Sequence, residues 1–189
     1  EERNVEYGID DGGGAFYGPK IDLHIKDALG RAWQCTTIQF DFNLPKRFGL
    51  SYIGEDGAEH QPLMVHRVIF GSLERFMGIL IEHYGGAFPL WLAPVQATII
   101  PISDRHLEYA RSVNDRLLAV GIRVETNDGN ERMNAKIRQA QLQKIPYMLI
   151  VGHKELEQET ASVRLRSGTD MGAMPLSDLI SHMDQDVGS

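Results

Sequence analysis

Apolar and polar residues alternate through much of the first ninety residues in the manner of β-strands. Residues 21–27 place Ile21, Leu23 and Ile25 on one face and polar side chains on the other. Residues 31–42 and 62–70 are rich in aromatic and β-branched residues, as strands are. A turn at Gly30 joins the first two runs, so the pattern predicts an antiparallel hairpin and a third strand. Residues 1–14 and 44–62 are expected to be loop and connecting segments.

After Gly71 the apolar spacing changes to steps of three and four, which is typical of an amphipathic helix. The stripe expected to face a core consists of Leu73, Phe76, Met77, Leu80 and Tyr84. Gly85 and Gly86 are expected to end this helix, because glycine readily adopts the left-handed conformation that closes helices.

Beyond a segment with two prolines, residues 88–96, the pattern changes to strands and helices in alternation. Strands are expected at residues 95–100, 122–126, 147–151 and 161–166, and helices at 104–120, 131–144 and 175–186. The β-α-β-α-β order predicts a mainly parallel sheet, to which the strand holding Val163 and Leu165 adds a small hairpin. We expect a domain boundary near Ala93, dividing the chain into residues 1–93 and 94–189.

Composition places the chain among ordinary globular proteins. It has 189 residues, 42% hydrophobic and 24% charged, with a net charge of −7, so bulk charge gives no argument for nucleic acid. The single cysteine, Cys35, excludes an internal disulfide and suits a reducing compartment. The acidic, glycine-rich start does not resemble a signal peptide, and the apolar runs are too short to cross a bilayer, so a cytoplasmic protein without a membrane partner is expected.

Arg75 is the first candidate for chemistry, because it lies at the start of the helix that follows Gly71. A helix N-terminus carries partial positive charge, so a cation there is mildly unfavourable and suits a site that accepts an anion. The alternative is a surface arginine paired with Glu74 or Glu82.

A strand, Gly71, SLERF and an amphipathic helix together resemble motif 3 of the class II aminoacyl-tRNA synthetases. Four further stretches narrow this resemblance to the threonyl-tRNA synthetases: FYGPKIDLHI, RAWQCTTIQFDFNLP, the segment from GEDG to IEHYGG, and FPLWLAP. The resemblance continues through KIPYMLIVGHKE. It implies an α/β protein: over 1–93, part of the antiparallel class II sheet with its motif 3 helix, and over 94–189, a three-layer α/β anticodon-binding domain with a mixed, mainly parallel sheet.

The resemblance also implies site residues in the first half. Arg75, with Ser72 beside it, would hold ATP, which enters as a substrate with Mg²⁺. The residues expected at the aminoacyl pocket and the terminal adenosine of tRNA are Tyr17, Lys20, Gln34, Cys35 and Gln39. From the sequence alone, Tyr17 to Lys20 could equally be a turn with a solvated lysine, and Cys35 a small buried hydrophobe.

His66 would be a zinc ligand, because this family holds one Zn²⁺ per subunit with one cysteine and two histidines. An open coordination position on zinc can select the hydroxyl and amine of threonine against isosteric valine. The family's other two ligands, and the motif 2 arginine, belong to a segment upstream of Tyr17. The zinc site is therefore expected to be incomplete, and the chain alone is expected not to activate threonine.

In the second half the resemblance implies anticodon contacts from Asn130, Arg138, Glu155 and Arg164. Asparagine and arginine can pair with base edges, and a glutamate can accept from an exocyclic amine. Each could instead be a cap or a solvated surface charge. Lys136, Arg123 and Arg166 are weaker candidates for phosphate contacts, and binding by this chain is expected to be weak and sensitive to salt.

We interpret the chain as a fragment of a threonine-tRNA ligase that retains anticodon-loop binding. The parent enzyme would join threonine to ATP and transfer it to threonine tRNA, and it is expected to be a homodimer, as class II enzymes typically are. The alternative is a non-catalytic, synthetase-like RNA-binding or regulatory module. A prolyl enzyme is a third possibility, although AWQC and His66 point away from it.

Overall fold

The computed structural model describes residues 7–188, so residues 1–6 of the expected N-terminal loop lie outside the described residues. The chain forms two compact units, a first unit up to His83 and a second unit from Tyr84 to Ser189. Among the described residues, no helix is long and apolar enough to cross a membrane.

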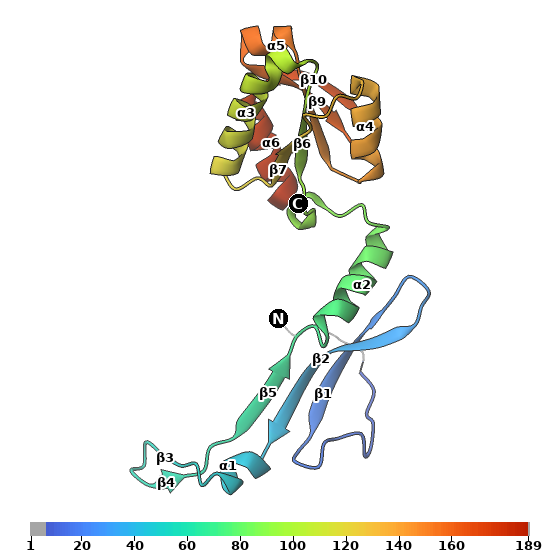
Figure 1. Cartoon of the computed structure of the whole chain (residues 1–189). Helices are drawn as coiled ribbons and strands as arrows, with labels where there is room; N and C mark the ends of the chain where they lie inside the picture. Colours follow the sequence, from blue (N-terminus) through green and yellow to red (C-terminus); the bar gives the residue numbers. More distant parts are fainter. Residues whose placement is uncertain (1–6, 189) are drawn as a thin grey trace. The chain divides into compact units, whose positions relative to one another are not determined.

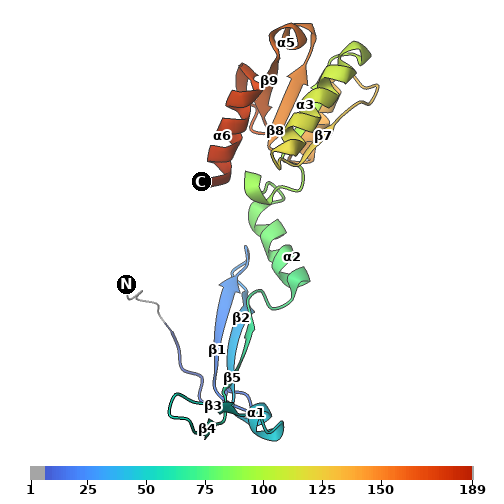
Figure 2. The same ribbon diagram turned by 90° about the vertical axis from the view of Figure 1, so that its left-hand side faces the viewer.

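The first unit is built on a three-stranded antiparallel sheet in the order β1-β2-β5. Its strands are β1 (Lys20–Lys26), β2 (Ala32–Asp41) and β5 (Met64–Val68), so the predicted hairpin and third strand are confirmed. A short helix, α1 (Asn43–Arg47), and a hairpin of β3 (Tyr52–Ile53) and β4 (Glu59–His60) lie at one end of this sheet (Figure 2). They occupy residues expected only to connect, because strands of two residues and a helix of five residues show no readable period.

The helix α2 (Leu73–Tyr84) follows β5 and ends before Gly85 and Gly86, which both have positive φ, as predicted. Its predicted inward stripe is only partly correct. Phe76 stacks on Phe70 with ring centroids 4.4 Å apart, and Ile79 is buried. Leu73 and Met77, however, are 63% and 59% exposed, because no described part of the first unit covers that side of the helix.

The second unit has three layers (Figure 1). Its sheet runs in the order β10-β9-β8-β6-β7, with β6, β7 and β8 parallel and β9 and β10 antiparallel, so the predicted mixed sheet is confirmed. The strands are β6 (Ala97–Pro101), β7 (Val124–Thr126), β8 (Tyr147–Val151), β9 (Thr160–Leu165) and β10 (Asp170–Pro175).

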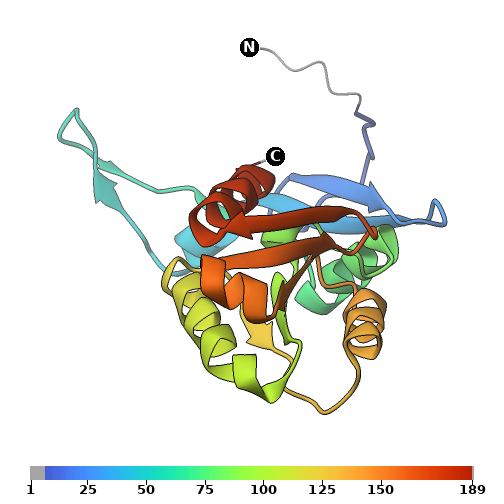
Figure 3. The same cartoon turned by 90° about the horizontal axis from the view of Figure 1, so that it is seen from above.

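Helices cover both faces of this sheet. Seen from above, α3 (Leu107–Ala119) and α4 (Met133–Leu142) flank it from opposite sides (Figure 3). The helix α6 (Leu176–Gly188) shares the larger core with α3, whereas α4 packs through Ile137 and Ala140 on Ile100 and Met148. Short turns of helix complete the unit: η1 (Leu90–Leu92), η2 (Asp104–His106) and α5 (His153–Gln158).

The division between the units differs from the expected boundary at 93/94. The linker segment, residues 84–93, belongs to the second unit because Leu90 is buried in its core and α6 packs on η1. Further, Gln96 donates from its amide to the carbonyl oxygen of Leu90 at 2.9 Å. The prolines suggested a connector, but Leu90 and Ala93 between them are buried.

Candidate functional site

Polar side chains predicted for the aminoacyl pocket lie in a row across the first unit's sheet. Lys20 on β1 is the register partner of Gln39 on β2, which is in turn the partner of His66 on β5. The Tyr17 hydroxyl donates to Oε1 of Gln39 at 2.9 Å, and the Tyr17 ring meets that of His66 edge-on at 6.0 Å. Strand register thus brings together residues from three separate stretches of sequence.

A second set of contacts extends this row along β1. Lys20 Nζ lies 2.7 Å from Oδ2 of Asp22, and Oδ1 of Asp22 accepts from Thr37 and from the Gln34 amide, each at 2.7 Å. The ammonium group of Lys20 is the main cause that holds the pKa of Asp22 below its ordinary value. Lys20 and Gln34 are therefore fixed by one carboxylate that the sequence did not single out.

Cys35 lies at a β-bulge between β1 and β2. Leu23 pairs with Thr36 whereas His24 pairs with Gln34, so Cys35 has no register partner. An extra residue in one strand reverses the side-chain alternation beyond it, and this places Gln34 within reach of Asp22 and Thr37. The Cys35 side chain itself is 1% exposed, which matches the alternative of a small buried hydrophobe.

His66 faces a buried carboxylate. Its Nε2 lies 2.8 Å from Oδ2 of Asp41, which is 1% exposed and also accepts from the backbone N–H groups of Asn43 and Leu44. Burial alone would raise the pKa of Asp41, but these hydrogen bonds, with His66 first, outweigh it and lower the pKa.

The residues present do not make a zinc site. Catalytic zinc needs three protein ligands, and within residues 7–188 no three His, Cys, Asp or Glu side chains cluster in a way that could hold a metal ion. His66 and Asp41 form an oriented pair, and Cys35 is buried in the bulge. His66 alone fits the expected ligand type.

Arg75 and Ser72 occupy the first turn of α2. Ser72 Oγ accepts from the Arg75 backbone N–H at 3.3 Å and donates to Glu74 at 2.7 Å, so it caps the helix. The Arg75 guanidinium donates to the carbonyl oxygen of Gln34 at 3.4 Å. The alternative pairing of Arg75 with Glu74 or Glu82 is not observed, because Glu74 accepts from Ser72 and Glu82 lies 3.6 Å from Arg31.

The four residues predicted to read the anticodon come from four separate segments of the second unit. Asn130 lies in the loop after β7, Arg138 is exposed on α4, Glu155 lies on α5, and Arg164 lies on β9. Asn130 lines a polar cavity of about 230 Å³ at the carboxyl ends of β6 and β7, together with Ser103. Ligands of open α/β sheets bind at such strand ends.

Glu155 is held by its own surroundings. Its carboxylate accepts from Ser162 Oγ at 2.7 Å and from the Gly152 backbone N–H at 3.0 Å. Burial acts to raise the pKa of Glu155, but the bond from Ser162 and backbone hydrogen bonds outweigh it and lower the pKa. Arg164 Nη2 lies 3.6 Å from Oδ2 of Asp170, and the buried Nε of Arg164 has no hydrogen-bond partner among the described residues. Glu155 therefore has a structural role as a cap in addition to the predicted one.

The weaker candidates for phosphate contacts are engaged elsewhere. Lys136 is buried and donates to the carbonyl oxygen of Asn127 at 3.0 Å. Arg123 donates to the carbonyl oxygens of Ala93 and Trp91 at 3.0 and 2.8 Å. Likewise, Arg166 donates to the carbonyl oxygen of Phe88 at 2.6 Å. These cations fasten loops, and Lys136 also lines the cavity that contains Asn130. Their phosphate contacts stay predictions.

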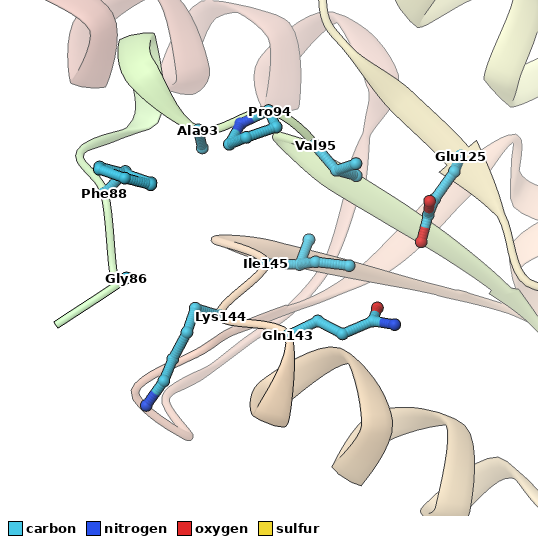
Figure 4. A pocket seen from close by; sticks show the side chains of 9 residues that line it. All are labelled: Gly86, Phe88, Ala93, Pro94, Val95, Glu125, Gln143, Lys144 and Ile145. Atoms are coloured by element: carbon cyan, nitrogen blue, oxygen red, sulfur yellow. The ribbon is translucent and has the colours of Figure 1, made fainter. Parts of the chain in front are cut away.

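Another cavity, of about 250 Å³, lies between the linker segment and the turn after α4 (Figure 4). Phe88 and Pro94 line one part of it, and Glu125 and Lys144 bring opposite charges to it. It contains none of the predicted site residues.

Two family models match the chain. Residues 2–84 match the tRNA synthetase class II core domain (G, H, P, S and T), and residues 96–185 match the anticodon binding domain. Threonine–tRNA ligases of Desulforamulus reducens and Sulfurihydrogenibium sp. are 56% and 57% identical to it over 99% and 100% of this chain. The chain belongs to the threonine–tRNA ligase family. It spans 29% of the length of these two threonine–tRNA ligases.

Solved structures agree with this assignment. The RNA binding domain of threonyl-tRNA synthetase from Cryptosporidium parvum Iowa II is 40% identical, with a TM-score of 0.85 over 92% of this chain and 44% of that one. A prolyl-tRNA synthetase from Cryptosporidium parvum, complexed with L-proline and AMP, is 21% identical with a TM-score of 0.69 over 94% of this chain and 41% of that one, which shows a shared fold. The predicted α/β fold of a threonine–tRNA ligase portion is confirmed.

Sequence reasoning missed four residues that organise polar contacts in this chain: Asp22, Asp27, Trp33 and Asp41. Each is a polar or amphipathic residue inside or beside a predicted strand, where its burial was not readable. Asp41 carried one signal, since a carboxylate just before a helical turn can cap it. Nothing local to the sequence linked Asp41 to His66, 25 residues away.

Proposed function

We propose that this chain comprises the last portion of the catalytic core of a threonine–tRNA ligase, up to His83, and the anticodon-binding domain together with the linker segment, from Tyr84. The observation that carries the proposal is the row of Lys20, Gln39 and His66 across three strands, with Tyr17 bonded to Gln39. These polar groups come from distant segments and lie side by side on one sheet. That sheet lies within the residues that match the class II core domain.

In the parent enzyme this row would contact threonine and the terminal adenosine of threonine tRNA. The threonine carboxylate attacks the α-phosphorus of ATP, which enters with Mg²⁺, and pyrophosphate leaves. A hydroxyl of the terminal adenosine then attacks the carbonyl carbon and AMP leaves. Tyr17, Gln34 and Gln39 offer neutral hydrogen-bonding groups that orient the reactants, while Lys20 and Arg75 supply positive charge.

His66 is proposed as one zinc ligand of the parent subunit, with Asp41 fixing its ring. The other ligands would lie outside residues 7–188, because the described residues do not complete a site. A homodimeric parent follows from the class II resemblance alone. The free thiol of Cys35 suits a reducing, cytoplasmic location.

The second unit is proposed to bind the anticodon loop through Asn130, Arg138, Glu155 and Arg164. Of these, Arg138 is the clearest candidate because it is exposed on α4 and, within residues 7–188, has no side-chain hydrogen bond like that of Glu155. Specific reading of RNA targets unstacked bases, which arginine can stack on and hydrogen-bond.

Binding of this chain to threonine tRNA tests the anticodon proposal. The measurement compares threonine tRNA with the same tRNA carrying exchanged anticodon bases, at two salt concentrations. We expect Arg138→Gln to weaken binding to the natural tRNA about tenfold. Arg111→Gln, an exposed arginine on α3 at the opposite face of the sheet, is the matched control and should leave affinity unchanged. Equal affinity for both tRNAs would reject base reading by this unit.

Threonine-dependent exchange of pyrophosphate into ATP tests the catalytic proposal. The full-length ligase should catalyse the exchange, and this chain alone should not, since the described residues lack a complete zinc site. A full-length protein without exchange activity would favour the alternative of a non-catalytic RNA-binding or regulatory module.

A further inference from the structure

Two arginine side chains converge on the indole ring of Trp33. The guanidinium carbon of Arg75 lies 5.5 Å from the ring centroid, and that of Arg31 lies 5.8 Å from it. Both distances are within the range in which a cation is attracted to an aromatic ring. Trp33 is therefore a shared contact of one arginine from the β1–β2 hairpin and one from the start of α2.

Asp27 fixes the orientation of this ring. Its Oδ2 accepts from Trp33 Nε1 at 2.8 Å and from Arg31 Nε at 2.6 Å, while Oδ1 accepts from the backbone N–H groups of Leu29 and Arg31. The Asp27 side chain is 1% exposed. An indole held by a buried, fully bonded carboxylate has little freedom to turn, so its face is a rigid surface for a neighbouring group.

The two arginines differ in how their charge is balanced. Arg31 pairs with Asp27 and lies 3.6 Å from Glu82. For Arg75, in contrast, the described residues place no carboxylate within ion-pair distance, and its guanidinium makes one long bond of 3.4 Å to the Gln34 carbonyl oxygen. Contact through the ring face leaves the N–H groups of a guanidinium available for other acceptors.

Backbone geometry brings Arg75 to this position. Gly71 has φ of +66°, and a Cβ there would lie 3.0 Å from the carbonyl oxygen of Cys35 in the bulge. The turn before α2 therefore packs directly on β2 beside Trp33. The approach depends on a glycine, because other residues are strained at this φ.

We propose that Trp33, held by Asp27, is a positioning residue for Arg75 that keeps its guanidinium aimed for ATP. This inference rests on the proposed function, in which Arg75 binds ATP. Trp33 itself need not touch the substrate. It fixes the position of the Arg75 guanidinium, whose positive charge is then balanced by the phosphates of ATP.

The test measures Michaelis constants in the full-length ligase by pyrophosphate exchange. Trp33→Leu should raise the KM for ATP about fivefold, which is the size expected for loss of one cation–π contact. The KM for threonine should stay within about twofold, because the contacts among Lys20, Asp22 and Gln34 do not involve the indole. Trp33→Phe keeps an aromatic face but lacks the indole N–H that Asp27 holds, so it should recover only part of the ATP affinity. Trp91→Phe, in the second unit, is the matched control and should match the wild type.

A double-mutant cycle separates failure of this inference from failure of the proposed function. In an Arg75→Ala background, Trp33→Leu should have no further effect on the KM for ATP. If Arg75→Ala leaves that KM unchanged, the ATP role of Arg75 is wrong, and the inference falls with it. If Arg75→Ala raises the KM for ATP but Trp33→Leu does not, only the positioning role is overturned. The same holds if the double variant shows the product of the two separate increases in KM. Equal rises in both Michaelis constants would show a merely structural role.

Discussion

Two buried aspartates, Asp27 and Asp41, organise the first unit at the scale of single residues. In each of them, Oδ1 accepts hydrogen bonds from two backbone N–H groups. The other oxygen, Oδ2, accepts from the indole N–H of Trp33 in Asp27 and lies within hydrogen-bond distance of the His66 imidazole in Asp41. A buried carboxylate is stable only when it is satisfied in this way. Each of them thereby ties a turn to a functional side chain: Asp27 to Trp33, and Asp41 to His66.

Acid should loosen the Trp33 surroundings through Asp27. The bond from Trp33, the largest cause, and those from Arg31 and Leu29 lower the pKa of Asp27 from 3.8 to about 2, against the effect of burial. Because the folded-state pKa is below the unfolded value, the stabilisation is complete above about pH 4 and is lost as the pH falls through 2. We expect the stability of the first unit to fall over this range, measured by Trp33 fluorescence in a Trp91→Phe chain.

Asp27→Asn provides the control for this prediction. The variant should be less stable at pH 7, and its stability should depend less steeply on pH between 4 and 2 because residue 27 no longer titrates. Some pH dependence should remain, because other carboxylates such as Asp22 and Glu74 still titrate. An unchanged pH dependence in Asp27→Asn would contradict the assignment of the transition to Asp27.

At the scale of elements, the junction between β2 and α2 decides where the motif 3 helix begins. The bulge at Cys35 carries the backbone out of regular alternation, and Gly71 packs against it. The hydrogen bond from Arg75 to Gln34 spans 41 residues of sequence and lies across this junction. The start of α2, the bulge at Cys35 and the polar row are thus connected by direct contacts.

Gly71→Ala should therefore destabilise the first unit by roughly 1–3 kcal/mol, the usual cost of a non-glycine residue held in this left-handed region. The added methyl would also press on the Cys35 carbonyl oxygen. Gly78→Ala is the matched control, because Gly78 lies within α2 with no atom within 4 Å of the new methyl. It should stabilise the unit by roughly 0.5–1 kcal/mol. Urea unfolding measures both; equal effects would contradict the packing argument.

At the scale of the whole molecule, the linker segment is part of the second unit. Leu90 fills its core, and Gln96, Arg123 and Arg166 donate to backbone oxygens of the segment. These cations and the buried amide donate to the carbonyl oxygens of Phe88, Leu90, Trp91 and Ala93. We infer that the second unit needs the linker segment to fold fully.

Two truncated chains test this. Residues 84–189 should unfold cooperatively in urea, whereas residues 94–189, cut at the boundary expected from the prolines, should be less stable by roughly 3 kcal/mol. The loss reflects removal of a buried leucine and of the acceptors for Gln96 and Arg123. Leu90→Ala in the longer chain should reproduce a large share of the loss. Equal stability of the two truncated chains would place the boundary at 93/94.

Much of the fold could be predicted because its signals are local. Alternation predicted β1, the content of aromatic and β-branched residues predicted β2 and β5, and spacing of three and four predicted α2, α3 and α4. The elements α1, β3, β4 and α5 escaped because strands of two residues and helices of fewer than two turns show no readable period. The strand β10 escaped because DMGAMP lacks alternation between apolar and charged positions.

The sequence by itself determined the order of strands and helices, the family resemblance and the types of residue at each site, because periodicity and motifs are properties of neighbouring positions. Only the tertiary structure decided that Asp41 meets His66, that Trp33 lies under Arg75 and that Arg123 and Arg166 hold the linker segment. Those contacts join residues far apart in sequence. They depend on strand register, on one bulge and on one positive φ, which set how distant segments approach and which side chains lose contact with water.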